Sequence, residues 1–339
     1  MKVCICGSGS LGHVCAAVLS SREGVSVNLL TRNPNLRAGE IVATDPGGKQ
    51  YRGSIEKVST WAREVITDSD LVLLCLPGFA IRPTLEKIKP FAGSTPVGSI
   101  VSSSGFFFEA MEIMPGHPLF GFQRVPFIAR TENYGRSARL LGYKKQLALA
   151  TVNVNDPESL RLMWERLWDT PTILLDSYLE AAISNSNPIL HTGRLYSMFG
   201  PGSKGAWERN IYFYREWTDE SSQIIMAMDS ELSLLLEKLN VSREHIPTLL
   251  DYYESRNESE LTRKLQSIAA FRDILSPMKQ TAGGSWTPDL QSRYFTEDFP
   301  CGLHYIKLLN DRNSVAAPTI DAVYRWGMGL LNRNDDGTV

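Results

Sequence analysis

A glycine-rich turn near the amino terminus has the spacing of a nucleotide-binding loop. Residues 6–12 read Cys-Gly-Ser-Gly-Ser-Leu-Gly, a G-x-G-x-x-G motif between an apolar run and a segment of helical periodicity. The first glycine permits a tight turn, the second lets backbone N–H groups approach a pyrophosphate, and the third allows close helix–strand packing. Glycines also occur in purely structural turns, but the motif's position here, with a positively polarised helix N-terminus behind it, favours dinucleotide binding. The residues expected to contact the dinucleotide are Gly7, Gly9, Ser10, Leu11 and Gly12.

The end of the second apolar run indicates which dinucleotide is bound. An NAD site usually has Asp or Glu about 20 residues after the glycines, where the carboxylate accepts hydrogen bonds from ribose hydroxyls. This chain has Thr31-Arg32 there, so no carboxylate repels a 2′-phosphate, and Arg32 can pair with one. The sequence therefore favours NADP over NAD, against the simpler interpretation that Arg32 is a solvated surface charge.

A third apolar run, residues 71–75, ends in Leu76-Pro77-Gly78. In open parallel sheets, ligands lie beyond the carboxyl ends of the strands. We therefore expect Leu76 and Pro77 to line the cofactor, with an ordinary Pro-Gly turn as the alternative.

Of the five histidines, His191 has the neighbours most typical of a reactive site. None of the five has the paired spacing of a metal site, so no metal is expected. Asn187 and His191 are four residues apart and would share one face of a helix. Pro188 would kink that helix unless it begins a new turn capped by Asn187. This polar segment suits the wall of a binding site, and a hydrogen-bonded structural histidine is the alternative.

A second polar segment, residues 292–303, combines Arg293, Glu297 and Asp298 with aromatic residues and ends near a proline and a glycine. The planar fork of an arginine matches a carboxylate, such as that of a 2-oxo acid. A carboxylate such as Asp298 can accept the Nδ1 proton of a histidine and thereby fix its tautomer. The commoner use of such residues is a helix cap with a surface salt bridge.

These segments resemble the opine dehydrogenase family, also described as the octopine/nopaline dehydrogenase family. Residues 293–302 are similar to its R-Y-x-T-E-D-x-P-x-G stretch, and residues 187–191 to the N-P-x-x-H segment that carries its catalytic histidine. The G-x-G-x-x-G motif agrees as well, so the resemblance spans the chain in the expected order. Ketopantoate reductases share the general architecture, but they use a catalytic lysine and glutamate, and this chain has no lysine at the position of His191.

The resemblance implies a reaction and a role for each residue. An amino acid amine condenses with a 2-oxo acid, and hydride from the nicotinamide of NADP, or of NAD, reduces the resulting imine. His191 would be the general acid and base, Asp298 would orient it, and Arg293 would hold a substrate carboxylate. Asn187 would provide a polar contact to substrate.

Two other functions stay open at this point. One is a 2-oxo acid reductase of the ketopantoate type on the same scaffold, which would need no amino acid. The other is a non-catalytic nucleotide-binding homologue, which would bind cofactor without turnover. That function gives no reason for Asn187, His191, Arg293 and Asp298 to occur together.

The order of elements explains how distant segments are positioned. In the first half, strand-like runs at 3–6, 25–30, 71–75 and 97–101 alternate with helical segments at 11–21 and 83–88, which predicts a parallel sheet. Asp45 to Lys49 is a turn signal and indicates a hairpin insertion or an extra crossover. The runs 121–131 and 145–152 are expected to extend the sheet. Asp156-Pro157 marks a helix start.

The second half has helical periodicity and no further strand-like runs. Helices are predicted at 178–199, 222–239, 246–253, 259–265 and 319–331, and residues 332–339 form a polar tail that we expect to fray. We therefore predict a doubly wound Rossmann-type α/β domain over residues 1–175. An all-helical domain of the 6-phosphogluconate dehydrogenase type, which would bind substrate, follows over 176–339.

Composition limits the classes of partner. The chain has 339 residues, 43% of them hydrophobic, and a formal charge of −2, which is typical of a globular protein of two domains. Near-neutral charge gives no signature of nucleic acid or membrane-surface binding, so small-molecule substrates are expected. Five scattered cysteines and the lack of an apolar run of about 20 residues predict a cytoplasmic protein. Whether it acts as a homodimer is not evident from the residues.

Overall fold

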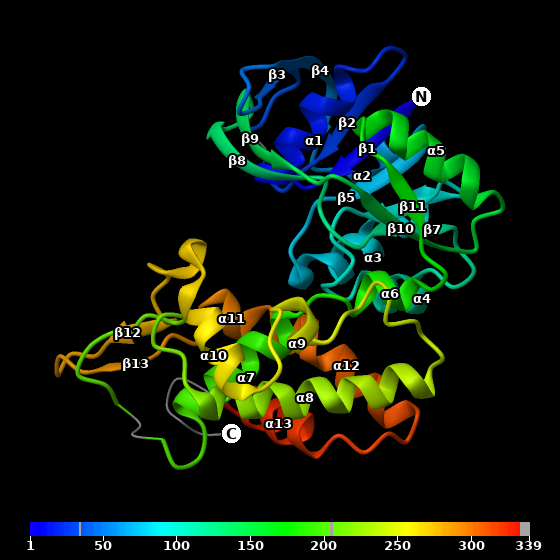
Figure 1. Ribbon diagram of the computed structural model, residues 1–339. Coiled ribbons are helices and arrows are strands. Elements are labelled where there is room, and N and C mark those ends of the chain that lie inside the picture. Colours follow the sequence, from blue (N-terminus) through cyan, green and yellow to red (C-terminus); the bar gives the residue numbers. More distant parts are fainter. Residues whose placement is uncertain (34, 204–205, 333–339) are drawn as a thin grey trace. The chain divides into compact units, whose positions relative to one another are not determined.

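The computed structural model describes residues 1–33, 35–203 and 206–332. The chain divides into two compact units, Met1–Ala182 and Ile183–Val339, each of which is considered by itself (Figure 1). None of the helices in these described ranges combines the length and the apolarity that crossing a membrane requires.

The first unit is built on one eleven-stranded sheet in the order β11-β10-β7-β6-β5-β1-β2-β4-β3-β9-β8. Its strands are β1 Lys2–Cys6, β2 Ser26–Leu30, β3 Gly39–Thr44, β4 Gln50–Ser59, β5 Leu71–Leu74, β6 Val97–Ser99, β7 Leu119–Phe122, β8 Phe127–Asn133, β9 Ser137–Tyr143, β10 Leu147–Val152 and β11 Thr172–Leu174. Its helices are α1 Ser10–Ser20, α2 Ala62–Ile66, α3 Ile81–Ala92, α4 Phe106–Ile113, α5 Pro157–Trp168 and α6 Tyr178–Ala182, with a short turn η1 Gly78–Ala80.

The centre of this sheet confirms the predicted Rossmann-type arrangement. Strand β1 pairs in parallel with β2 on one side and with β5 on the other, and β6 and β7 continue in parallel beyond β5. All four residues of β5 and residues 3–6 of β1 are buried, because helices cover both faces of a parallel sheet. The helix predicted after the glycine motif is α1.

The hairpin predicted at Asp45 to Lys49 is confirmed. Strands β3 and β4 pair antiparallel, and the turn is closed by Lys49 N–H, which donates to Asp45 Oδ1 at 2.9 Å. Strand β4 also runs parallel to β2, so the hairpin extends the sheet. The predicted single run 121–131 is wrong in its extent, because it comprises the end of β7, a turn and most of β8.

A second hairpin, β8–β9, was not predicted in full, because β9 has a half-exposed alternating pattern without a long apolar run. Strand β9 pairs with β3, and β3, β4, β8 and β9 all pack against α1. In Figure 1 this part of the sheet curls around α1. The loop of the hairpin thereby reaches the glycine motif at the start of α1.

The predicted start of α5 is confirmed. The side chain of Asp156 accepts a hydrogen bond from Ser159 N–H at 2.9 Å, and Pro157 lies in the first turn. Such a cap satisfies a backbone donor that has no partner within the helix.

The second unit is helical, as predicted. Its helices are α7 Asn187–Phe199, α8 Asp219–Lys238, α9 Leu249–Tyr252, α10 Glu258–Ser267, α11 Arg293–Thr296, α12 His304–Arg312 and α13 Pro318–Leu331, with a 3₁₀ turn η2 Ala269–Phe271 and a π-type turn η3 Phe299–Leu303. One correction concerns the expectation of helices alone: β12 Met278–Gln280 and β13 Trp286–Pro288 form a two-stranded antiparallel ribbon. Helix α12 was also missed, and residues 333–339 of the predicted frayed tail lie outside the described residues.

The predicted helix 178–199 is two helices. Helix α6 ends at Ala182 and α7 begins at Asn187, with Pro188 in the first turn. A proline lacks the N–H that an interior turn needs, so in the first turn it costs the helix no hydrogen bond. Asn187 is the first helical residue and not the cap, since Ser186 occupies the capping position. The helix that carries His191 therefore has no proline kink in its interior.

Candidate active site

Each of the three glycines of the motif is required for a steric reason. A larger residue would not fit at two of the positions, and at the third it would obstruct the open space beside the loop. Gly7 has φ +117°, and a Cβ there would lie 2.5 Å from the carbonyl oxygen of Cys75. A Cβ on Gly12 would lie 2.0 Å from the carbonyl oxygen of Gly7, so only glycine lets α1 start this close to the turn. Nothing lies within 4 Å of a Cβ built on Gly9. The loop is therefore tightly packed behind Gly7 and Gly12 and open at Gly9, where a phosphate group would approach.

An open cavity of about 500 Å³ lies beside this loop. It is lined by Cys6, Gly7, Ser8, Gly9, Leu30, Thr31, Arg32, Asn33, Cys75, Leu76, Pro77, Phe79, Ala80, Pro83, Thr84, Lys87 and Tyr134. Six of the residues predicted to contact cofactor are among them, namely Gly7, Gly9, Thr31, Arg32, Leu76 and Pro77. Ser10, Leu11 and Gly12 do not line it; they form the first turn of α1 directly behind.

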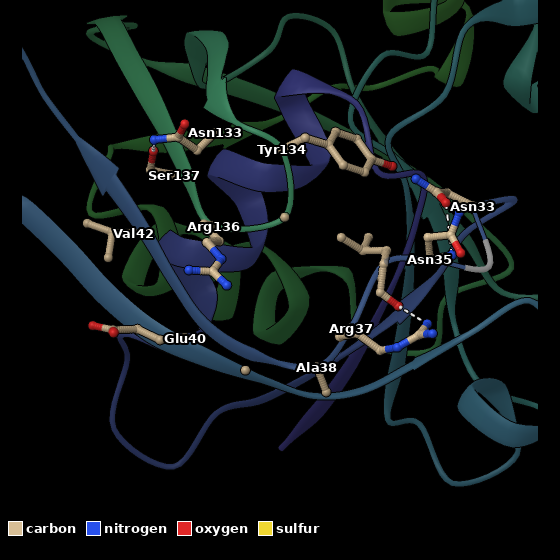
Figure 2. A pocket seen from close by; sticks show the side chains of 13 residues that line it. Asn33, Asn35, Arg37, Ala38, Glu40, Val42, Asn133, Tyr134, Arg136 and Ser137 are labelled. Carbon is tan, nitrogen blue, oxygen red and sulfur yellow. Dashed lines mark hydrogen bonds between the residues drawn. The ribbon is translucent and has the colours of Figure 1, made fainter.

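The β8–β9 hairpin forms part of this site, although no sequence motif predicted it. Tyr134 OH lies 2.6 Å from Ser8 Oγ, and Thr131 N–H donates to Ser10 Oγ at 3.1 Å. Tyr134 and Asn33 also border a second cavity, of about 610 Å³, between this hairpin and the segment after β2 (Figure 2). The sequence signal for this part of the site would have been a turn between two strands. It was not recognised, because the second of those strands, β9, was not predicted.

His13 joins the hairpin to the glycine loop. Its Nδ1–H donates to the carbonyl oxygen of Gly9 at 2.9 Å, and its Nε2 accepts from Gly135 N–H at 2.6 Å. The side chain is 2% exposed, and burial lowers its pKa more than the backbone hydrogen bonds raise it. The hydrogen bond from Gly135 requires the neutral ring, because a protonated Nε2 has no lone pair to accept it.

In the second unit, the structure brings His191 and Asp298 together. Nδ1 of His191 lies 2.8 Å from Oδ2 of Asp298, and both side chains are mostly buried. A carboxylate accepts only, so Nδ1 carries the proton and the ring is fixed in one tautomer. This is the arrangement that orients a histidine for proton transfer.

Local packing explains how segments more than a hundred residues apart meet. A Cβ on Gly302 would lie 2.6 Å from Cγ of Pro188, so the absence of a side chain lets η3 pack on the start of α7. On the other face of α7, a Cβ on Gly193 would lie 2.5 Å from Ile225 of α8. Pro188 and Gly302, one from each polar segment, thus allow the contact that brings Asp298 to His191.

Aromatic side chains surround the histidine. Its ring centroid lies 4.5 Å from that of Tyr294 and 5.8 Å from that of Phe213. Its Nε2 lies 2.9 Å from the hydroxyl of Tyr214. Tyr214 was not predicted from the sequence, because it belongs to neither polar segment and no spacing rule connects it with His191.

Arg293 and Asn187 are not in hydrogen-bond contact with the histidine pair. Arg293 begins α11 and is exposed, and across the described ranges its guanidinium forms no salt bridge. Asn187 is also exposed, at the start of α7. The structure therefore brings two of the four predicted residues, His191 and Asp298, together. It leaves the other two at the surface, Asn187 on α7 and Arg293 on α11.

Comparisons with known proteins agree with both units. Residues 174–331 match the family model described as NAD/NADP octopine/nopaline dehydrogenase, alpha-helical domain. Residues 3–103 match the model for ketopantoate reductase PanE/ApbA.

Relatives match over nearly the whole chain. Octopine dehydrogenase from Mizuhopecten yessoensis is 24% identical, over 98% of this chain and 90% of its own length. A solved octopine dehydrogenase with NADH and L-arginine superposes with a TM-score of 0.82 at 21% identity, covering 100% of this chain and 92% of that one. Yersinopine dehydrogenase with NADP+ gives a TM-score of 0.76 at 13% identity, covering 100% and 94%.

The glycine loop and the histidine–aspartate pair thus occur in a chain whose helical domain matches an opine dehydrogenase model and whose first domain matches a reductase model. Relatives that this chain matches over about nine-tenths of their own length are named octopine dehydrogenase and tauropine dehydrogenase. Residues 174–331 thus carry the helical domain of the octopine/nopaline dehydrogenase family, and the chain as a whole is similar to octopine dehydrogenases, which are NAD(P)-dependent oxidoreductases.

Proposed function

We propose that the protein is an NAD(P)H-dependent opine dehydrogenase that joins the amine of an amino acid to a 2-oxo acid and reduces the imine. The observation that carries this proposal is the 2.8 Å hydrogen bond between His191 Nδ1 and Asp298. This hydrogen bond joins the two segments, residues 187–191 and 293–302, that each resemble a motif of the family. In this proposal residues 1–175 bind the dinucleotide and residues 176–339 bind the substrates.

The glycine loop fits the cofactor. The free space at Gly9 and the first turn of α1, with the N–H groups of Ser10, Leu11 and Gly12 lacking partners within the helix, suit a pyrophosphate. When bound, the reduced nicotinamide supplies the hydride. Leu76 and Pro77 would form the cavity wall beyond β5.

We infer a preference for NADP from the segment after β2. Arg32 lines the cavity, is exposed and has no carboxylate beside it in the segment Leu30 to Asn33. A guanidinium can pair with a 2′-phosphate in bidentate fashion. Thr31 is held by a 2.7 Å hydrogen bond between its hydroxyl and that of Ser8, and so lies at the ribose end of the loop.

The histidine pair supplies proton transfer. His191 would accept a proton as the amine attacks the 2-oxo acid, and it would return a proton as the imine forms and is reduced. An imidazole suits both steps because it exchanges protons near neutral pH. Asp298 keeps the ring in the tautomer that leaves Nε2 for this exchange and stabilises the charged ring.

Two exposed residues would bind the substrates. Arg293 has no salt-bridge partner of its own among the described residues and offers a planar fork to the carboxylate of the 2-oxo acid. Asn187, one helical turn before His191, would provide a polar contact to the second substrate. The solved octopine dehydrogenase with L-arginine supports an amino acid as that substrate.

A second candidate is a 2-oxo acid reductase that needs no amine, which the ketopantoate reductase match of residues 3–103 favours. The two activities differ in one requirement. The opine reaction consumes cofactor only when amine and oxo acid are both present, whereas the reductase oxidises NADPH with the oxo acid alone.

A substrate matrix tests the proposal. Each of a set of amino acids is combined with pyruvate, 2-oxoglutarate or glyoxylate, and NADPH absorbance is followed, with mass spectrometry of the product. We expect oxidation that depends on both substrates and a product that contains a new secondary amine. Equal rates without amino acid would establish the reductase instead, and binding of NADPH without turnover of any pair would contradict both.

A further inference from the structure

Both ring nitrogens of His191 have partners. Asp298 accepts a hydrogen bond from Nδ1–H, so in the neutral ring Nε2 carries the lone pair. The hydroxyl of Tyr214, 2.9 Å away, then donates to Nε2. The chain of hydrogen bonds runs from tyrosine to histidine to aspartate.

This arrangement limits how His191 can reach a substrate. Nε2 is the nitrogen left for proton exchange, and the Tyr214 hydroxyl covers it. The histidine is 9% exposed and the tyrosine 4%. For Nε2 to contact a substrate atom directly, the tyrosine would have to move away.

The ring of Tyr214 is held firmly in place. It stacks on Phe271 at a centroid distance of 4.3 Å and on Trp217 at 5.8 Å, with interplanar angles of 25° and 8°. Stacked on both rings and buried, it has little room to swing. The fixed hydroxyl is therefore better suited to transmit a proton than to be displaced.

We propose that Tyr214 is a further catalytic residue, which passes the proton between His191 and the substrate. The inference rests on the proposed opine reaction. In the reductive direction the O–H bond of Tyr214 breaks as its proton forms the new N–H bond of the product amine. In the same step the Nε2–H bond of the imidazolium breaks and its proton forms a new O–H bond on Tyr214. The tyrosine is unchanged, and the imidazolium becomes neutral imidazole.

The surroundings favour a transfer in which both protons move together. Burial, with Tyr294, Tyr253 and Asp298 nearby, raises the pKa of Tyr214 well above its ordinary value. A free tyrosinate would therefore be a costly intermediate. Proton delivery from His191 as the tyrosine proton leaves avoids that charge.

Tyr214→Phe is the direct test, because it keeps the stacked ring and removes only the hydroxyl. We expect kcat to fall about 10²-fold or more with KM little changed.

A solvent isotope measurement tests whether two protons move in the same step. In mixtures of H2O and D2O, the plot of the wild-type rate against deuterium fraction should be curved, as expected when two protons are transferred in the rate-limiting step. In the variant it should become linear. Tyr305→Phe removes another buried tyrosine hydroxyl from the same unit, at 8% exposure, and should leave both measurements unchanged.

A measurement without cofactor or turnover accompanies it. In cofactor-free protein labelled with ¹⁵N-histidine, loss of the tyrosine donor should move the Nε2 resonance of His191 downfield in Tyr214→Phe and not in Tyr305→Phe. An unchanged resonance would overturn the relay, as would a kcat within about threefold of wild type or a linear wild-type plot. These outcomes differ from failure of the proposed function, which the absence of any opine product in the substrate matrix would establish.

Discussion

Nδ1 of His191 and Oδ2 of Asp298 lie 2.8 Å apart although 107 residues separate them in the chain. The turn that follows Asp298 packs through Gly302 on Pro188, three residues before the histidine. The carboxylate is therefore held against the ring by the packing of one segment on the other, which is what an orienting residue requires.

Asp298→Asn should lower kcat by about 10²-fold or more. The amide has nearly the same shape, but it lacks the negative charge that stabilises the imidazolium, and it can donate to Nδ1 and so favour the wrong tautomer. Initial rates of NADPH oxidation measure the effect. Asp273→Asn, an exposed acid of the same unit, is the control. A variant with kcat within about threefold of wild type would remove Asp298 from the mechanism.

Arg293→Ala should mainly raise KM for the 2-oxo acid. Loss of a charged hydrogen-bonding partner costs about 1.5–3 kcal/mol, or roughly tenfold to hundredfold in affinity. Arg293→Lys should recover only part of this, because an ammonium cannot form the bidentate pair. Arg263→Ala, which removes an exposed arginine of α10, serves as the matched control. If KM for every oxo acid stays at the wild-type value, the carboxylate binds elsewhere.

Arg32→Ala should reduce the preference for NADPH over NADH. The guanidinium interacts with the 2′-phosphate that NADH lacks, so KM for NADPH should rise about tenfold while KM for NADH changes little. The ratio of kcat/KM for the two cofactors, in wild type and variant, gives the result directly. Arg63→Ala removes another exposed arginine of the same unit, outside the cavity. An unchanged ratio would show that Arg32 does not decide between the cofactors.

The sequence predicted those parts of the molecule whose physical cause is local. Apolar runs such as residues 71–75 become buried parallel strands because both faces must be covered. Gly7 and Gly12 are required by close contacts at a single turn. His191 and Asp298 were found because each lies in a short segment with its own polar pattern.

Other parts depend on tertiary contacts that no short segment reveals. Tyr214 reaches His191 only because α7 and the segment after it fold back on each other, and its neighbours Phe213 and Trp217 resemble ordinary core residues. Strand β9 shows weak periodicity by itself and is stabilised by pairing with β3 and β8. As a result, the hairpin loop at Tyr134 and its link to His13 became evident only in three dimensions.

His13 leads to a prediction about pH. Burial lowers the pKa of this histidine below its unfolded value, so between those two pKa values the unfolded chain binds more protons than the folded one. The contribution to stability is therefore complete above the unfolded pKa, near 6.5, and is lost as the pH falls through that value toward the folded one. In the same range, protonation of Nε2 would break its hydrogen bond with Gly135 and loosen the hairpin over the glycine loop, so NADPH affinity should also weaken.

His13→Asn separates this effect from other titrating groups. Asparagine is too short to bridge Gly9 and Gly135, so the variant should have a lower Tm and weaker NADPH binding at pH 7.5, and both should change less than in wild type between pH 7.5 and 5.5. The control is His117→Asn, since burial also lowers the pKa of His117, whose ring contacts the Thr95 carbonyl. That variant should alter the pH dependence of Tm and leave that of NADPH affinity as in wild type. If NADPH affinity of His13→Asn depends on pH as steeply as in wild type, His13 does not couple the hairpin to the cofactor site.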